Sequence, residues 1–319
     1  MQAWQFSTAE AGLELTEVDA PAPGPGEVLI DVAAAGMCHS DVHIVNGHGD
    51  DWLRKRPITL GHEVAGTVSG LGAGVTGLNV GDRVAVALPA HPIEQADFTN
   101  GIGLGFDGGY AKQAVAPRDI VVAIPDGVPF THAAVATDSI ATAYHAVVAE
   151  AGVQAGAKVA VIGLGGLGLS AVAVAKTLGA TVYGVDINTA VFDTAREQGA
   201  AECFANIGEV PTPIDAVLDF AGMGTTTAEA IAAVKPGGRV VVVGLGAPEA
   251  NIPTHLLVTK NVQLRGSLGA SIPDLEAVLE LLATGQIVPA IEEVPFAEVP
   301  AALARIEAGQ VQGRLVTCP

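Results

Sequence analysis

The segment Cys38–His43 and the pair His62-Glu63 hold the densest group of reactive side chains in the sequence. A cysteine, a histidine and nearby carboxylates are side chains that bind zinc or orient its ligands. Taken alone, Cys38 reads as a small buried apolar residue, and His62-Glu63 as a polar turn. Their combination after a predicted strand favours a metal site.

A glycine-rich segment predicts a dinucleotide site. Its sequence is Gly163-Leu164-Gly165-Gly166-Leu167-Gly168. It follows an apolar strand pattern over 157–163 and leads into a helix pattern over 167–179. Gly163 permits a tight turn, Gly165 lets the backbone approach a pyrophosphate, and Gly168 lets the helix pack on the strand. The free N–H groups at the start of the helix bind phosphates. An ordinary glycine-rich turn is the alternative.

Asp186 indicates which dinucleotide is bound. It ends the next predicted strand, 18 residues after Gly168. A carboxylate at this place accepts hydrogen bonds from the adenosine ribose and repels a 2′-phosphate. Residues 187–190 contain no Lys or Arg that could bind such a phosphate. We therefore expect NAD in preference to NADP.

The elements that must position these residues fall into two regions. Short β-branched runs separated by Gly and Pro fill the first third and indicate an irregular β-barrel-type unit. After about residue 135, buried strands alternate with helices, which predicts a doubly wound parallel sheet. Strands are expected at 157–163, 181–186, 214–222, 239–245 and 261–267, the last two buried, and helices at 139–149, 167–179, 188–199, 225–238 and 274–285.

Composition excludes several classes of protein. Half of the 319 residues are hydrophobic, so the chain has enough apolar material to fold. The sequence has 15 Lys and Arg against 34 Asp and Glu, and the basic residues form no run, so no nucleic-acid partner is expected. No uncharged run is long enough to span a membrane, and the N-terminus has no signal-peptide pattern. The three scattered cysteines do not suggest a disulfide scaffold, and we expect a cytoplasmic protein.

Five segments, in order along the chain, resemble the zinc-dependent medium-chain alcohol dehydrogenases. They read GMCHSDVHIVNG, PITLGHEVAGTV, VGDRVAV, GGYAKQAV and AVIGLGGLGLSAVAVAKTLGATVYGVD. The resemblance covers essentially the whole chain and implies an α/β protein. It implies a GroES-like catalytic domain at 1–135, completed by 286–319, and a Rossmann NAD-binding domain at 136–285.

The resemblance implies a ligand set for one catalytic zinc ion. Cys38 and His62 match the first two ligands of the family, and Asp138 stands where the third, usually a cysteine, is found. Glu63 resembles a carboxylate that approaches the metal transiently during ligand exchange. Asp41 resembles the carboxylate that orients His62.

Asp138 departs from the family pattern. Zinc accepts a carboxylate oxygen as well as sulfur, so Cys-His-Asp is an acceptable ligand set. The alternative is that Asp138 only caps the helix expected over 139–149.

The resemblance also implies roles in proton transfer and cofactor binding. Ser40 and His43 match a relay that carries the substrate proton to solvent. His39 and Arg314 match positions that hold the pyrophosphate, and Thr142 matches a residue that touches the nicotinamide ring. The remaining histidines, His48, His91, His132, His145 and His255, have no match and are expected to be surface or packing residues.

A second, structural zinc ion of the family is not expected. The corresponding lobe, residues 88–109, contains no cysteine, so we expect one zinc per chain. Because this lobe borders the family's active-site cleft, substrate preference does not transfer. Trp52 and Leu88 are expected to line the substrate pocket.

The predicted function is that of an NAD-preferring oxidoreductase. Hydride passes between a primary or secondary alcohol, activated as a zinc-bound alkoxide, and the cofactor, giving an aldehyde or ketone. One alternative is a zinc-free enone or quinone reductase that uses NADPH, but such enzymes normally lack the counterparts of Cys38, His62 and Asp41. A second is a nucleotide-binding structural protein, which would have no use for a proton relay. A homodimer or homotetramer is expected.

Overall fold

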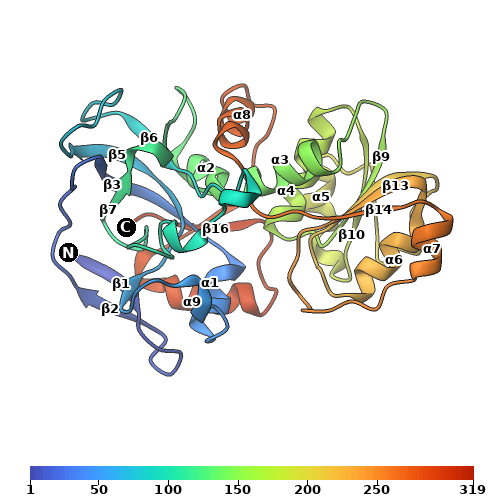
Figure 1. The fold of residues 1–319 in the computed structure, drawn as a ribbon, viewed down its shortest axis with the longest axis horizontal. Helices are drawn as coiled ribbons and strands as arrows, with labels where there is room; N and C mark the ends of the chain where they lie inside the picture. Colours follow the sequence, from blue (N-terminus) through green and yellow to red (C-terminus); the bar gives the residue numbers. More distant parts are fainter. The chain divides into compact units, whose positions relative to one another are not determined.

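The computed structural model describes the backbone of residues 1–319 and all side chains other than those of Asp50 and Phe98. Packing divides the chain into two units (Figure 1). The first comprises Met1–Ala141, Ala270–Thr284 and Ile291–Pro319, and the second comprises Thr142–Gly269 and Gly285–Ala290. The domain boundaries expected at 135/136 and 285/286 stay a prediction. In packing terms, helix α8 (Ile272–Ala283) lies in the first unit.

A seven-stranded sheet forms the centre of the first unit. Its order is β15-β16-β3-β5-β6-β8, and β7 pairs separately with β3. The strands are β3 (Glu27–Met37), β5 (Glu63–Leu71), β6 (Arg83–Val86), β7 (Gln113–Pro117), β8 (Val121–Ala123), β15 (Ile291–Val294) and β16 (Arg314–Thr317). Only β15 and β16 are parallel neighbours. Alternate β3 residues Val28, Ile30 and Val32 are buried, which is the period-2 pattern of a strand with one face in the core.

Smaller elements complete this unit. A second sheet has the order β2-β1-β4, with β1 (Gln2–Phe6), β2 (Leu13–Glu17) and β4 (Ile58–Thr59). Helix α1 (His39–Val45) follows β3 directly and contacts α9 (Val299–Glu307). This mostly antiparallel, irregular arrangement confirms the β-rich unit expected in the first third of the sequence.

One helical run extends from Phe130 to Glu150. It consists of α2 (Phe130–Val135), the π-helical η5 (Ala136–Ile140), α3 (Ala141–His145) and the π-helical η6 (Ala146–Glu150). The helix expected over 139–149 is therefore wrong at its start. The first turns are hidden in the sequence because their small apolar residues, Ala133 to Ala136, are all buried and show no amphipathic period.

A six-stranded parallel sheet forms the second unit. Its order is β11-β10-β9-β12-β13-β14, the arrangement of a doubly wound nucleotide-binding fold. The strands are β9 (Lys158–Ile162), β10 (Thr181–Val185), β11 (Glu202–Phe204), β12 (Ile214–Asp219), β13 (Val234–Val242) and β14 (Gln263–Gly266). The helices are α4 (Gly166–Thr177), α5 (Phe192–Glu197), α6 (Thr225–Ala233) and α7 (Thr254–Thr259). The predicted α/β class is confirmed.

Helices cover both faces of this sheet. Ala160 and Ile162 of β9 belong to the apolar cluster under α6 and α7, which lie together beside the sheet in Figure 1. Val161, between them, points to the other face, where α4 packs so closely that a Cβ on Gly168 would lie 3.6 Å from it.

Two sequence expectations about this unit are wrong. The helix expected over 225–238 ends at Ala233, because Val234 already pairs with Ile214 and a bulge follows before the regular β13 register resumes. The strand expected to be buried at 261–267 is β14, whose four residues are all exposed at the edge of the sheet. None of the helices in the described part of the chain has the length and apolar character to span a membrane.

Candidate functional site

Three adjacent strands of the first unit and the π-helical segment η5 of the same unit bring the metal-ligating side chains together. In the sheet, Glu63 of β5 pairs with Gly36 of β3, whose other neighbour is Val316 of β16. Cys38 follows β3 and His62 precedes β5. Because these strands are antiparallel neighbours, both residues lie at the same end of the pair, and Asp138 contacts them from the π-helical segment. One donor atom from each of Cys38, His62, Glu63 and Asp138 lies within 4.8 Å of the others.

The distances among these donors fit a zinc ion. Cys38 Sγ lies 3.4 Å from Asp138 Oδ2, and His62 Nε2 lies 3.6 Å from the same oxygen. Zinc bonds of about 2.3 Å to sulfur and about 2.0 Å to nitrogen or oxygen, at tetrahedral angles, separate neighbouring ligands by about 3.3–3.5 Å. The Asp138 oxygen therefore lies near ligand spacing from both other donors.

The position of Asp138 in its helix removes the capping alternative. The helical run begins at Phe130, so Asp138 lies inside it rather than before its first turn. Single π-helical turns are rare and occur often at functional sites. Here the wider turn carries the one carboxylate of the run that faces Cys38 and His62.

Glu63 Oε2 and Arg314 Nε are buried atoms of the site that have no hydrogen-bond partner within the described residues. Asp41 Oδ1 and His62 Nδ1 make no hydrogen bond of standard geometry either, but they face each other at 3.3 Å. Buried polar atoms are normally satisfied, so an unpartnered carboxylate oxygen beside three donors fits a bound cation. A Cβ at Gly36 would overlap Glu63 Oε2, which explains why the strand has a glycine there.

Arg314 lies against the carboxylates of this site. Its guanidinium pairs with Glu63 Oε1 and lies 3.8 Å from Asp138 Oδ2, and its side chain is buried. Burial and the Asp138 charge raise the pKa of Cys38, but Arg314 and His62 outweigh them, and the net shift is downward. A lowered pKa favours the thiolate, the form of cysteine that binds metal. The expected contact of Arg314 with pyrophosphate stays a prediction.

Asp41 and His62 form a buried pair behind the donors. Asp41 Oδ1 lies 3.3 Å from His62 Nδ1, which leaves Nε2 free to face Asp138. Burial lowers the pKa of His62, but the Asp41 charge and hydrogen bonds to Asp138, Asp41 and Cys38 raise it well above its usual value. Burial likewise raises the pKa of Asp41, and the His62 charge with hydrogen bonds from His62, Cys38 and Tyr110 lowers it overall.

Tyr110 is the residue at this site that the sequence did not single out. Its hydroxyl donates a hydrogen bond to Asp41 Oδ2 at 2.8 Å. No spacing rule connects positions 41 and 110, so only the folded arrangement shows this contact. The GGYAKQAV segment was visible in the sequence, but nothing in it assigned the tyrosine a partner.

Helix α1 carries the residues expected to relay protons. Ser40 Oγ lies 3.5 Å from Cys38 Sγ, and His43 stands one turn further along the same helix. The His43 ring is half-buried, 6.2 Å from the ring of Trp52 and 6.2 Å from that of His48. His43 is not among the clustered donors of the described residues, and its relay role stays a prediction. His39 lies 5.9 Å from His43, ring to ring, and burial together with the charges of His43 and Arg314 lowers its pKa.

The glycines of the second unit occupy the positions expected for a dinucleotide site. Gly163 has a φ of +84°, in the left-handed region that favours glycine. A Cβ on Gly168 would overlap the Gly163 carbonyl oxygen, so the close approach of α4 to β9 requires glycine. A Cβ on Gly165 would meet nothing within 4 Å, so space lies open where a phosphate group would approach. Gly166 and Leu167 begin α4.

Asp186 is fixed at the end of β10. Its Oδ2 accepts a hydrogen bond from the Leu164 N–H at 2.7 Å, and its Oδ1 accepts one from the Asn188 N–H at 2.8 Å. Each oxygen keeps a further lone pair for a ribose hydroxyl. Thr142 is buried in α3 of the same unit, and its contact with nicotinamide stays a prediction. Trp52 and Leu88 pack against the apolar core of the first unit, and their place in a substrate pocket also stays a prediction.

Family models match most of the chain. "Alcohol dehydrogenase GroES-like domain" matches residues 24–126, and "Zinc-binding dehydrogenase" matches residues 166–284. The chain belongs to the zinc-dependent medium-chain alcohol dehydrogenase family, which confirms the resemblance noted in the sequence.

Individual relatives align over almost the whole chain. An alcohol dehydrogenase of Geobacillus stearothermophilus is 31% identical, over 99% of this chain and 98% of its own length. The acetophenone reductase of Geotrichum candidum, solved in complex with NAD, is 31% identical with a TM-score of 0.89, covering 100% of this chain and 97% of that one. The cobalt- and zinc-bound alcohol dehydrogenase of Pyrobaculum aerophilum is 30% identical with a TM-score of 0.89, covering 100% and 99%.

Proposed function

We propose that this chain is an NAD- and zinc-dependent alcohol dehydrogenase that interconverts a primary or secondary alcohol with its aldehyde or ketone. The observation that carries the proposal is the placement of Cys38, His62 and Asp138, whose donor atoms are spaced as the ligands of one zinc ion. The glycine-rich turn and Asp186 of the second unit support NAD as the hydride acceptor.

Zinc, when bound, supplies Lewis acidity, which lowers the pKa of a bound water from about 15.7 to about 7. The proposed ligands carry two negative charges, a thiolate and a carboxylate, beside a neutral imidazole. A carboxylate at Asp138 in place of the family's second thiolate therefore leaves the total charge of the ligands unchanged, but it replaces a soft sulfur ligand by a hard oxygen ligand.

The chain's own groups move the proton. Ser40 Oγ takes the proton of the substrate hydroxyl and passes its own toward His43, which releases a proton to solvent. NAD, when bound, would supply the acceptor for the hydride that leaves the carbon bearing the hydroxyl. A general base contributes about 10²–10⁴-fold, so we assign Ser40 and His43 a supporting role and the metal site the larger one.

The second unit binds and selects the cofactor. The N–H groups at the start of α4 and the open space at Gly165 accommodate the pyrophosphate. Asp186 accepts the ribose hydroxyls and disfavours a 2′-phosphate. His39, Arg314 and Thr142 are proposed as further cofactor contacts, and Trp52 and Leu88 as substrate contacts.

The test is a metal analysis combined with an alcohol panel. We expect about one zinc per chain and alcohol oxidation with a higher kcat/KM for NAD than for NADP. A metal-free chain that reduces enones with NADPH would instead support the reductase alternative, which the clustered donors argue against. Equal kcat/KM values for the two cofactors would remove the role given to Asp186.

We further propose a homodimer or homotetramer located in a reducing compartment such as the cytoplasm. The exposed edge strand β14, with Leu264 and nearby Val258 at the surface, supports self-association, because exposed strand edges pair readily. The unpaired cysteines, Cys38, Cys203 and Cys318, support the compartment. Light scattering and cell fractionation test these two points.

A further inference from the structure

We propose that Tyr110 is a positioning residue for His62, acting through the carboxylate of Asp41. The inference rests on the proposed role of His62 as a zinc ligand and goes beyond it. Tyr110 follows the cysteine-free lobe, 88–109, in a segment that neither the metal ligands nor the relay explains.

The contacts form a chain of three side chains. Tyr110 is completely buried, and its hydroxyl donates to Asp41 Oδ2 at 2.8 Å. The same oxygen accepts the Cys38 N–H at 3.0 Å, while the other oxygen of Asp41 faces His62 Nδ1 at 3.3 Å. The Tyr110 hydroxyl and the Cys38 N–H thus fix Oδ2 of Asp41 in place. The other oxygen, Oδ1, then orients the imidazole ring of His62.

The tyrosine hydroxyl is suited to this task because it keeps its proton. Burial and the Asp41 charge raise the pKa of Tyr110 well above its usual value, so the group remains a donor. The backbone oxygen of Gly36 lies 3.3 Å away as a second acceptor, but the shorter contact to a charged oxygen is the stronger one.

The backbone of Tyr110 is also fixed beside His62. The Tyr110 N–H donates to the Leu60 carbonyl at 3.0 Å, and the Gly109 N–H donates to the Gly61 carbonyl at 2.7 Å. A Cβ on Gly61 would lie 2.6 Å from the Tyr110 ring, so the ring packs directly on the residue before His62. Tyr110 therefore contacts both the neighbour of His62 in sequence and its partner in space.

The experiment removes only the hydroxyl. We would prepare the Tyr110→Phe protein, strip its metal, and measure the zinc Kd with a chromophoric chelator and the visible absorption of the Co²⁺ form. Residues behind metal ligands typically contribute 10–100-fold to metal affinity, and we expect about a tenfold rise in Kd and shifted Co²⁺ bands. Tyr183→Phe is the matched control, because Tyr183 is also buried but lies in the second unit, and we expect it to leave both readouts unchanged.

A double-mutant cycle tests the route through Asp41. In an Asp41→Asn background, Tyr110→Phe should change the zinc Kd by less than about twofold, because the carboxylate it acts on is gone. A full tenfold effect in that background would assign Tyr110 a packing role and overturn the inference. So would an unchanged zinc Kd and Co²⁺ spectrum for Tyr110→Phe alone, or a Tyr110→Phe chain that does not fold. A wild-type chain that binds no zinc would instead overturn the proposed ligands, before any variant is compared.

Discussion

The metal site and the dinucleotide site of this protein are built in opposite ways. The glycine-rich part of the dinucleotide site comes from one continuous stretch, β9 to the end of β10, although a Cβ on Gly163 would also meet the backbone of Ala221, just beyond β12. The metal site draws Cys38, His62, Asp138 and Arg314 from four separate parts of the sequence. A continuous site depends mainly on local backbone geometry, whereas a dispersed site depends on strand register and on the residues behind its ligands.

The largest effect is expected from the ligand farthest away in sequence. Asp138→Ala should reduce alcohol oxidation by at least about 10³-fold, because it removes a ligand of the Lewis acid, which contributes several kcal/mol. NAD binding, measured by fluorescence quenching, should change by less than about twofold, since the glycine-rich turn lies in the second unit. An active Asp138→Ala protein that retains zinc would show that Asp138 is not a ligand.

Two glycine variants separate cofactor binding from folding within the continuous site. Gly165→Ala places its Cβ in open space, so Tm should hold while the Kd for NAD rises about tenfold or more. Gly168→Ala forces α4 away from β9, so unfolding free energy should fall by about 1–3 kcal/mol. Thermal unfolding and NAD titration of both variants check this contrast. Equal losses of stability in the two would contradict the separate roles.

The dispersed site should respond to pH in two opposite directions. His62 has a higher pKa in the folded, metal-free protein than in the unfolded chain, where it is about 6.5. The protonated imidazole therefore stabilises the metal-free fold fully below about pH 6.5, and this stabilisation is lost as the pH rises through the pKa of His62 in the folded protein. Zinc must displace the same proton, so zinc affinity should keep rising with pH above 6.5, by up to about tenfold per unit. Metal-free Tm and zinc Kd, each followed from pH 6 to 9, test the pair. Zinc affinity that is flat above pH 6.5 would contradict it.

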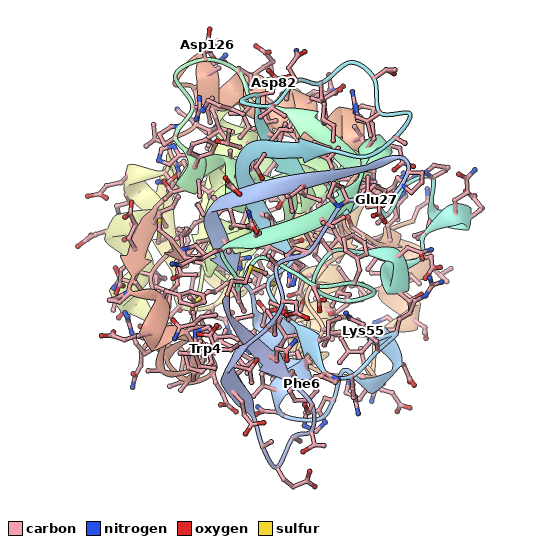
Figure 2. All side chains as sticks on the ribbon, turned by 90° about the vertical axis from the view of Figure 1, so that its left-hand side faces the viewer. Trp4, Phe6, Glu27, Lys55, Asp82 and Asp126 are labelled. Carbon is pink, nitrogen blue, oxygen red and sulfur yellow. The ribbon has the colours of Figure 1, made fainter. Side chains whose placement is uncertain are left out.

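The smallest effect is expected in the lobe that lacks a structural zinc. Lys55, at the surface in Figure 2, pairs with Asp107 at 2.6 Å, and Arg54 pairs with Asp97 at 3.5 Å. Asp107 also accepts the Thr59 N–H, and Asp97 accepts hydrogen bonds from Thr99 and Asn100. These carboxylates are thus engaged by protein groups.

Surface pairs of this kind contribute about 0–1 kcal/mol and are screened by salt. Lys55→Met should therefore lower unfolding free energy by less than about 1 kcal/mol at low salt, with the difference shrinking at 1 M NaCl. The zinc content should remain one per chain. A loss of metal in Lys55→Met would indicate that the lobe controls the catalytic site.

The same contrast explains what could be read from the sequence. The roles of Gly163, Gly165 and Gly168 follow from their spacing between a predicted strand and a predicted helix, and their backbone geometry agrees with those roles. The alternation of strands and helices after residue 135 predicts the parallel sheet for the same local reason. Cys38 and His62 were recognisable as ligand types, but Asp138 was assigned only by resemblance, since its helix starts earlier than its sequence indicates.

Contacts between residues far apart in the sequence, and the position of a strand at the edge of a sheet, could not be predicted from the sequence. The Tyr110–Asp41 hydrogen bond joins residues 69 positions apart, and nothing in either segment specifies the other. The exposure of β14 depends on its place at the end of the sheet order, which its apolar residues do not reveal. The pairing of Arg314 with Glu63 likewise arises from the β5-β3-β16 neighbourhood, across 251 positions.

The carboxylate of Asp138 has a consequence for oxidative damage. A zinc site with two thiolates can close a disulfide between its own ligands once peroxide has converted one of them to a sulfenic acid, and the metal is then expelled. Here Cys38 is the one sulfur among the clustered donors, so no such bond can form within the site. A sulfenic acid on Cys38 is therefore not captured as a disulfide within the site, so an added thiol can reverse it, whereas further peroxide oxidises it irreversibly to the sulfinic acid.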